Sequence, residues 1–211
     1  MRNRLAIRYS VEGDLRFISH HDSLRLFERA LLRADLPLRY SEGFNQRPRI
    51  SIALPRPVGV ASRDELLVIA LVEPVDPSTV VTRLTPQMPQ GLALLDAEPV
   101  DDDDRRLPCE ATYSLSIDRD AAGRLAEKAG DILASPTLVV ERAVPGKGSQ
   151  CKSVDIRPYL QLIEVKGDTL RWTQTVTGTG TARVGEVLDA LGLPSGEHLH
   201  RLTREGVKYE R

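Results

Sequence analysis

The sequence has few of the residue types that build metal clusters or stacking surfaces. It contains two cysteines, Cys109 and Cys151, and neither belongs to a CxxC or CxxxCxxC spacing. A metal cluster held by this chain's cysteines is therefore not expected, and reduced thiols in the cytoplasm fit best. Aromatic residues make up 4% of the chain. This scarcity disfavours an RNA-recognition sheet with aromatic side chains on its central strands.

Long apolar segments are absent as well. No run of about 18 apolar residues occurs, so we expect no transmembrane helix. The polar start, Met1 to Arg4, does not resemble a signal peptide. We therefore expect a cytoplasmic protein that has no contact with a membrane.

Charge is distributed unevenly along the chain, although the net charge is −1. Residues 2–56 carry 11 arginines against 6 acidic residues, a net charge of +5. Residues 57–104 carry 2 arginines against 10 acidic residues, a net charge of −8. A local basic face can attract polyanions even when the whole chain is almost neutral.

The periodicity of apolar residues predicts a first domain over residues 1–100. Alternation with period two predicts strands, and apolar positions three and four apart predict helices. The expected strands are 5–11, 50–54, 65–72 and 91–95, and the expected helices begin at about Ser19 and at Asp76. This order, βαββαβ, is the ferredoxin-like arrangement.

A second domain is expected over residues 109–211, after an acidic linker at 101–108. Asp101 to Asp104 repel one another and favour a solvated connection. The expected strands are 111–117, 137–141, 160–165, 169–176 and one after His198, the expected helices are 119–134 and 184–191, and 144–149 is a loop. We therefore predict an α+β protein with two ferredoxin-like halves, the second with an extra strand.

One stretch, residues 14–49, joins a basic helix to a glycine-aromatic loop. Four basic residues recur at every fourth position, opposite the apolar side: His21, Arg25, Arg29 and Arg33. A solvated helix face alone explains such a stripe. In the loop, Gly43 allows close approach of a ligand, and Phe44 offers a stacking surface. Arg47 and Arg49 can bind phosphate or carboxylate with their planar donors.

The two adjacent histidines do not predict a metal site. Neighbouring helical side chains diverge by about 100°, so His20 and His21 cannot both face one ligand. His20 could serve as a general acid or base in RNA cleavage, since its ordinary pKa lies near ~6.5. The alternative is a histidine that only hydrogen-bonds its neighbours at the helix start.

A glycine-rich turn, residues 178–183, precedes a helix in the second half. Its backbone amides could receive a phosphate, with Arg183 as a clamp. The turn is neither GxGxxG nor a Walker loop, and as a plain glycine turn it needs no ligand. With Lys152 and Arg157, it could extend one anion-binding surface across both halves.

These segments resemble the DUF2344, or radical SAM-linked, protein family. The resemblance rests on Arg16–His20, Asp22, Glu28–Ala30, Arg33–Pro37, Tyr40–Asn45 and Arg47–Arg49, and later on Lys152–Pro158, Gly180–Arg183 and Glu186–Leu188. Val184 departs from the pattern, which has proline there. The family's motif residues correspond to Arg16, His20, Asp22, Arg29, Gly43, Phe44, Asn45, Arg49, Lys152, Asp155, Arg157 and Arg183.

The resemblance implies a companion of a separately encoded radical-SAM enzyme, without a cofactor of its own. Such genes tend to lie beside those of ribosomal proteins and ribonuclease G, which points to RNA or a ribosome component. We therefore expect a non-catalytic, RNA-directed accessory protein. The expected anion- or RNA-binding residues are the motif residues together with Arg25, Arg33 and Arg47.

Two other functions remain open at this point. One is a metal-independent endoribonuclease with a double ferredoxin-like fold, in which His20 is catalytic. The other is a protein-interaction scaffold that docks the enzyme through residues 16–49 or through the acidic segment 57–104.

Overall fold

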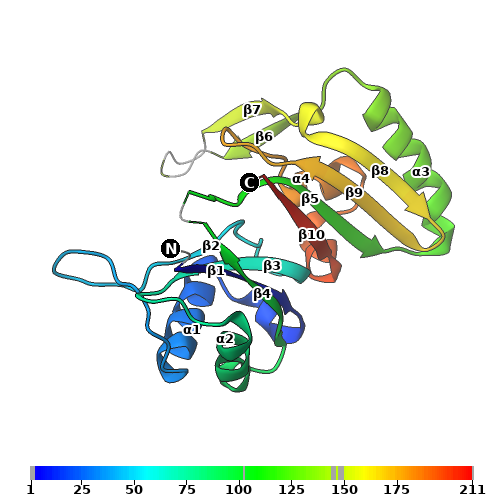
Figure 1. Cartoon of the computed structure of the whole chain (residues 1–211). Helices are drawn as coiled ribbons and strands as arrows, with labels where there is room; N and C mark the ends of the chain where they lie inside the picture. Colours follow the sequence, from blue (N-terminus) through cyan, green and yellow to red (C-terminus); the bar gives the residue numbers. More distant parts are fainter. Residues whose placement is uncertain (1–2, 102, 144–145, 147–149, 211) are drawn as a thin grey trace. The chain divides into compact units, whose positions relative to one another are not determined.

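A computed structural model of the chain describes residues 3–101, 103–143, 146 and 150–210 (Figure 1). The chain divides into two compact units, Met1–Pro108 with Tyr209–Arg211, and Cys109–Lys208. Each unit combines helices with antiparallel strands, so the protein belongs to the α+β class. Along the described residues, no helix is both long and apolar enough to cross a membrane.

The first unit follows the order strand, helix, two strands, helix, strand. Its elements are β1 (Arg4–Val11), α1 (His20–Arg33), β2 (Ile50–Ile52), β3 (Ala61–Ala70), α2 (Pro77–Leu84) and β4 (Leu92–Val100), with short 3-10 turns at Gly13–Phe17 and Thr85–Gln87. The strands lie in the order β4-β1-β3-β2, and the β1–β4, β1–β3 and β2–β3 pairs are antiparallel. Ile7, for example, lies opposite Leu67 on one side and Ala97 on the other.

One face of this sheet is covered by both helices. Ile7 on β1 is fully buried in a cluster with Phe27 of α1 and Leu84 of α2. The rings of Tyr9 and Phe27 meet edge to face, with their centroids 4.8 Å apart. Because side chains alternate along a strand, Arg4 lies on the face of the sheet away from the helices.

Both helices of the first unit begin as the sequence predicts. The Ser19 hydroxyl accepts a hydrogen bond from the Asp22 amide (3.1 Å) and caps α1. The Asp76 carboxylate accepts from the Ser78 amide (2.8 Å) and caps α2. α1 ends at Arg33, and Asp35 then turns the chain with a positive φ of 50°. Glycine usually occupies such a position, and its absence made this helix end less apparent in the sequence.

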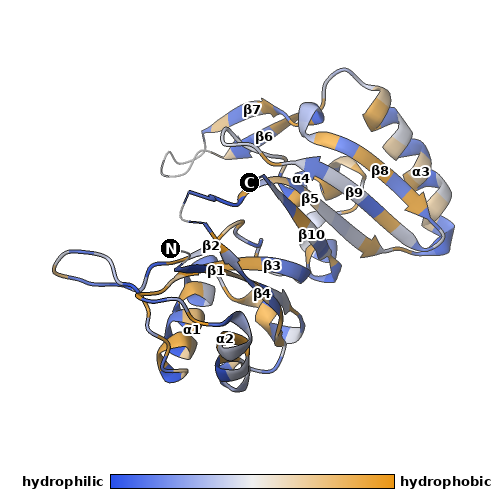
Figure 2. Cartoon of the chain, in the orientation of Figure 1, coloured by the Kyte–Doolittle hydropathy of each residue, from blue (hydrophilic) through white to orange (hydrophobic). Residues whose placement is uncertain are grey.

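The second unit repeats this strand order with additions. Its elements are β5 (Leu107–Ser116), α3 (Arg119–Ala134), β6 (Val139–Ala143), β7 (Cys151–Asp155), β8 (Leu160–Lys166), β9 (Thr169–Thr175), α4 (Val184–Ala190), α5 (Ser195–His198) and β10 (Thr203–Glu210), with 3-10 turns at Arg157–Tyr159 and Leu199–Arg201. Its strands lie in the order β10-β5-β9-β8, while β6 and β7 form a separate two-stranded sheet. Figure 2 shows hydrophobic and hydrophilic residues interspersed along β8.

A buried aromatic pair lies at the centre of the second unit. The ring of Trp172 is fully buried and stacks on Tyr113 at a centroid distance of 5.3 Å. Its indole N–H donates to the Gln174 side chain (3.0 Å), whose amide donates to the Ala182 carbonyl (2.6 Å). The indole N–H is thereby satisfied, as a buried donor requires.

Several element boundaries differ from the predictions. β3 begins at Ala61 rather than Glu65, and β4 continues to Val100. The sequence did not predict β7 or α5, because neither has a clear apolar period. Of the loop predicted at residues 144–149, only Gly146 lies among the described residues.

The acidic connection is more ordered than the charge run implied. Asp102 lies outside the described residues, but the guanidinium of Arg4 donates to the carbonyls of Asp101 (3.1 Å) and Asp104 (3.0 Å). β5 already begins at Leu107, inside the segment predicted as a linker. These hydrogen bonds reach back to the start of the chain, so the local charge pattern could not reveal them.

Candidate functional site

The segment from Arg39 to Arg49 forms a narrow antiparallel ribbon, called here the 39–49 ribbon. Tyr40 bridges Pro48, the Ser41 amide donates to the Arg47 carbonyl (2.8 Å), and the Arg49 amide donates to the Arg39 carbonyl (2.8 Å). Residues 42–46 close the ribbon as a loop that extends away from β2 (Figure 1).

Phe44 lies at the tip of this loop with its side chain fully exposed, at 110% relative accessibility. Gly43 beside it has a positive φ of 119°, a conformation that other residues rarely adopt. No atom lies within 4 Å of the position where a Cβ of Gly43 would stand. Asn45 is exposed too, so the tip is open to a ligand.

Three arginines share one face of the ribbon. Residues directly opposite in an antiparallel pair share a face, and so do alternate residues of one strand. Arg39 lies opposite Arg49, and Arg47 lies two positions before Arg49, so their side chains are on one side. Across the described part of the chain, no carboxylate pairs with these three guanidinium groups.

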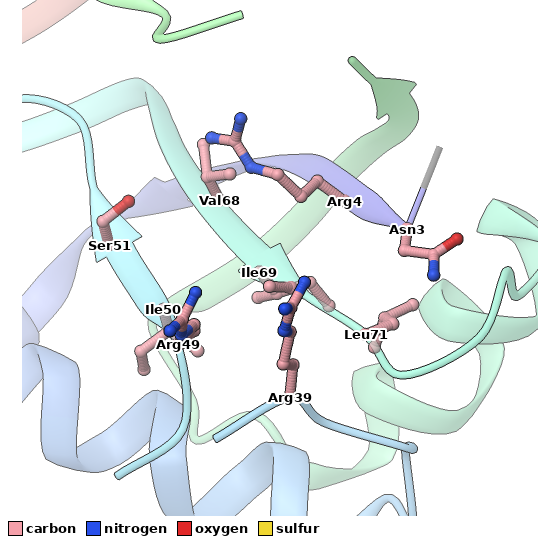
Figure 3. A pocket seen from close by; sticks show the side chains of 10 residues that line it. Asn3, Arg4, Arg39, Arg49, Ile50, Ser51, Val68, Ile69 and Leu71 are labelled. Atoms are coloured by element: carbon pink, nitrogen blue, oxygen red, sulfur yellow. The ribbon is translucent and has the colours of Figure 1, made fainter. Parts of the chain in front are cut away.

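β3 positions two of these arginines. The carbonyl of Ala70 accepts from the Arg39 amide (2.8 Å), and the Ala70 amide donates to the Arg49 carbonyl (2.9 Å). At this end of β3 the surface is hollowed, with a volume of about 590 Å³ (Figure 3). The lining residues are Asn3, Arg4, Arg39, Arg49, Ile50, Ser51, Val68, Ile69, Ala70 and Leu71. This hollow, the ribbon hollow, is lined by basic, neutral and apolar residues, and none of its described lining residues is acidic.

The predicted stripe on α1 borders a different hollow. Arg25, Arg29 and Arg33 are exposed. The hollow they border, called here the α1 hollow, has a volume of about 440 Å³ and is lined by Asp22, Arg25, Leu26, Arg29, Arg33, Gln87, Met88 and Pro89. The Arg33 guanidinium donates to the Gln87 side chain (3.0 Å) and carbonyl (3.2 Å). Arg25 lies 3.5 Å from the Asp22 carboxylate.

The two hollows share no lining residue. The single basic platform expected from residues 14–49 is therefore two separate basic surfaces within the first unit. α1 covers one face of the sheet, whereas Arg4 in the ribbon hollow belongs to the other. The sequence could not show this division, because it depends on which face each element covers.

Of the predicted site residues around the start of α1, Asp22 serves the helix cap. The Ser19 hydroxyl donates to the Asp22 carboxylate (2.7 Å), and this bond is the main cause that lowers the pKa of Asp22. Burial, followed by the charge of His21, lowers the pKa of His20. The Nδ1 atom of His20 is buried and has no hydrogen-bond partner among the described residues. Arg16 donates to the carbonyl of Gly13 (2.9 Å).

Two site residues predicted in the second unit bind its own backbone. The Asp155 carboxylate accepts from the amides of Leu138 (2.8 Å) and Arg157 (3.0 Å). The Arg157 guanidinium donates to the carbonyls of Leu160 (2.8 Å) and Leu133 (2.6 Å). These contacts hold the turn after β7 against α3 and β8, so both side chains are engaged internally.

The other two predicted residues of this unit are exposed. Lys152 lies on β7, and Arg183 is the N-cap of α4. The Arg183 amide already donates to the Glu186 carboxylate (2.9 Å), which also binds Arg142 at 2.6 and 2.8 Å. A carboxylate of the protein therefore occupies one of the amides of the 178–183 turn that the sequence suggested for a phosphate. Hydrogen bonding to Glu186 also raises the pKa of Arg142.

No cluster of three or more histidine, cysteine, aspartate or glutamate side chains suited to a metal ion occurs in the described ranges. Sequence reasoning overlooked Arg39 and Arg4 as site residues. A signal for Arg39 was present: Arg39 and Arg49 lie at equal distances in sequence from Phe44. Treating 39–49 as a hairpin centred on Phe44 would have paired the two arginines.

A family model described as "Uncharacterized protein conserved in bacteria (DUF2344)" matches residues 4–185. The chain belongs to the DUF2344 family. The match spans most of both units and confirms the family resemblance noted in the sequence. The comparison with curated proteins gave no match.

Among solved structures, this DUF2344 protein is similar to a chain of the "Crystal Structure of a Cbf5-Nop10-Gar1 Complex". The TM-score is 0.42 at 8% sequence identity, and the alignment covers 100% of this chain and 49% of that chain. The DUF2344 protein therefore spans about half the length of its neighbour. A TM-score at this level is too low to assign a fold or a function.

Proposed function

We propose that this DUF2344 protein is a non-catalytic, RNA-binding accessory protein of a separately encoded radical-SAM enzyme. One observation carries the RNA-binding part: a fully exposed Phe44 at the tip of a ribbon that presents on one face three arginines with no carboxylate partner among the described residues. An apolar ring held in water gains free energy when a ligand covers it. Planar guanidinium groups bind phosphate with paired hydrogen bonds.

Single-stranded RNA matches this combination better than a duplex does. In a single strand the bases are free to stack on an aromatic ring, and each stacked base contributes about 1–3 kcal/mol. Arginines beside the ring contact phosphates without reading the sequence. The ribbon therefore binds a short single-stranded segment, with a base on Phe44 and phosphates along Arg47 and Arg49.

We propose a ferredoxin-like fold for each unit, over residues 1–100 and 109–211, with 101–108 as their connection. The support is the shared strand order, β4-β1-β3-β2 in the first unit and β10-β5-β9-β8 in the second. The sheet of β6 and β7 is then an insertion between the first helix and second strand of the second domain.

The partnership with a radical-SAM enzyme rests on the family resemblance. The α1 hollow offers a surface for such a partner, because Leu26 and Met88 lie there beside exposed arginines. An acidic segment of the enzyme would complement it. A charge reversal, Arg29→Glu, should then weaken co-purification of the enzyme after nuclease treatment, while Phe44→Ala should leave it unchanged.

RNA binding is tested with a fluorescently labelled single-stranded oligonucleotide and anisotropy at low salt. Phe44→Ala should weaken binding about tenfold or more, in keeping with the loss of one stacked base. Phe44→Trp should retain binding, and Arg29→Ala is the matched control on α1. Unchanged affinity in Phe44→Ala would refute this use of the ribbon. Cleavage of RNA by the wild type and not by His20→Ala would instead support an endoribonuclease.

A further inference from the structure

The ribbon hollow brings two positive charges together, and among the described residues no carboxylate pairs with either of them. Arg39 and Arg49 lie directly opposite each other, and like charges in this arrangement destabilise a strand pair. No acidic residue is found among the described residues that line the hollow. Figure 3 shows the two side chains next to each other where the ribbon meets β3. An anion bound between them would convert this repulsion into attraction.

The remaining lining residues suit an organic phosphate better than a bare anion. Ile50 provides apolar surface beside the arginines, while Val68 and Leu71, which also line the hollow, are almost fully buried, and Ser51 adds a neutral hydroxyl. The volume of about 590 Å³ leaves room for a sugar next to the phosphate. Arg4, on the neighbouring strand β1, adds positive potential, although its guanidinium already donates to the carbonyls of Asp101 and Asp104.

Charge selects the kind of phosphate. A phosphomonoester carries about −1.5 to −2 at neutral pH, whereas the ester of an RNA backbone carries one negative charge. Two forked guanidinium groups can neutralise a dianion completely and donate to several of its oxygens. A diester leaves one of the two positive charges unmatched.

We infer that the ribbon hollow binds a phosphomonoester dianion between Arg39 and Arg49. Such a group occurs at the 5′ end of an RNA strand and on a free mononucleotide. The strand-end version rests on the proposed RNA-binding function. In that version this protein binds the 5′ ends of RNA strands, with the end phosphate in the ribbon hollow and a nearby base stacked on Phe44.

The experiment compares four probes on the full chain: a 5′-phosphorylated hexauridylate, its 5′-hydroxyl counterpart, uridine 5′-monophosphate and inorganic phosphate. Titration calorimetry should give about tenfold tighter binding of the phosphorylated strand. Arg39→Gln and Arg49→Gln should remove this difference, and Arg29→Gln should keep it. The preference should also decline below pH ~6, where the monoester becomes a monoanion.

The outcomes separate the two proposals. Equal binding of both strands, with equal losses in the Arg39 and Arg49 variants, overturns the dianion inference and leaves RNA binding intact. Binding of the mononucleotide that depends on Arg39, without binding of either strand, supports the hollow and refutes the RNA function. Failure of all four probes refutes the inference. Arg39→Lys keeps the positive charge and loses the paired donors of the guanidinium group, so it should retain weaker binding. This variant therefore separates a folding defect, which would abolish binding, from a lost contact.

Discussion

Arginine side chains in this protein occupy two different environments, which their sequence motifs do not distinguish. Arg157 belongs to a family motif, yet its guanidinium is bound to the carbonyls of Leu133 and Leu160. Arg39 lies outside the predicted set, yet its guanidinium faces an open hollow. Whether an arginine can bind a ligand depends on whether its donors are already satisfied.

We predict that Arg157→Ala destabilises the second unit by about 1–3 kcal/mol, because two partly buried carbonyls lose their charged donor. The midpoint of urea unfolding, followed by the fluorescence of Trp172, measures this loss. Lys152→Ala is the control from the same motif, and since Lys152 is exposed its effect should remain within about 0.5 kcal/mol. Similar effects of the two substitutions would contradict a structural role for Arg157.

A second prediction concerns His20, whose pKa is lowered by burial and by the charge of His21. The folded state binds a proton on His20 less readily than the unfolded state does. The stabilising contribution is therefore present above the ordinary pKa of about 6.5, and it declines as the pH falls from there through the folded pKa.

An NMR titration of the His20 ring should give a pKa below the ordinary histidine value. His20→Gln should reduce the loss of stability between pH 7 and the acid range. A folded-state pKa at or above about 6.5 would show that burial does not control this histidine.

The helix α1 depends on its cap, since its first amides have no partner within the helix. The Ser19 hydroxyl accepts from the Asp22 amide at 3.1 Å and donates to its carboxylate at 2.7 Å. Ser19→Ala should cost about 1 kcal/mol in the free energy of unfolding, measured by urea titration. Ser19→Thr retains a hydroxyl and should cost much less. Equal losses in both variants would assign the effect to packing instead.

The 39–49 ribbon should show opposite responses in stability and binding. Arg39→Glu places a carboxylate opposite Arg49, and an opposite-charge pair across strands contributes about 0.2–1 kcal/mol. The ribbon amides should therefore exchange with solvent more slowly, as hydrogen-exchange NMR can measure. Binding of the phosphorylated strand should be lost. Retained binding would show that the anion does not lie between the two arginines.

For the molecule as a whole, RNA affinity should come from a local surface, because the net charge of the chain is −1. If three ribbon arginines contact phosphates, the logarithm of the binding constant should fall with the logarithm of salt concentration at a slope of about −2. Arg47→Ala should reduce the slope by about 0.7, while Arg25→Ala should leave it unchanged. A slope near zero would exclude phosphate contacts.

Much of the element order was predictable because helices and strands record their packing in local periodicity. α3 covers Arg119–Ala134, the range that its apolar spacing predicts, and its buried positions include Leu125 and Ile132. The short β7 was not predictable, because its pairing with β6 rather than a local pattern defines it. The length of β3 was not predictable either, because the residues before Glu65 join the strand by pairing with β1, as Ser62 does with Val11.

The amino-acid sequence was sufficient to predict the helix caps, the alternating strands, the concentration of arginine near the start of the chain and the family. These features depend on residues close together in the chain, where spacing and side-chain chemistry act directly. The grouping of the arginines required the folded chain. Hydrogen bonds from Ala70 on β3 hold Arg39 and Arg49 side by side, while α1 carries Arg29 to a separate hollow. Such contacts join residues distant in sequence, and no local pattern encodes which face of a sheet each of them will occupy.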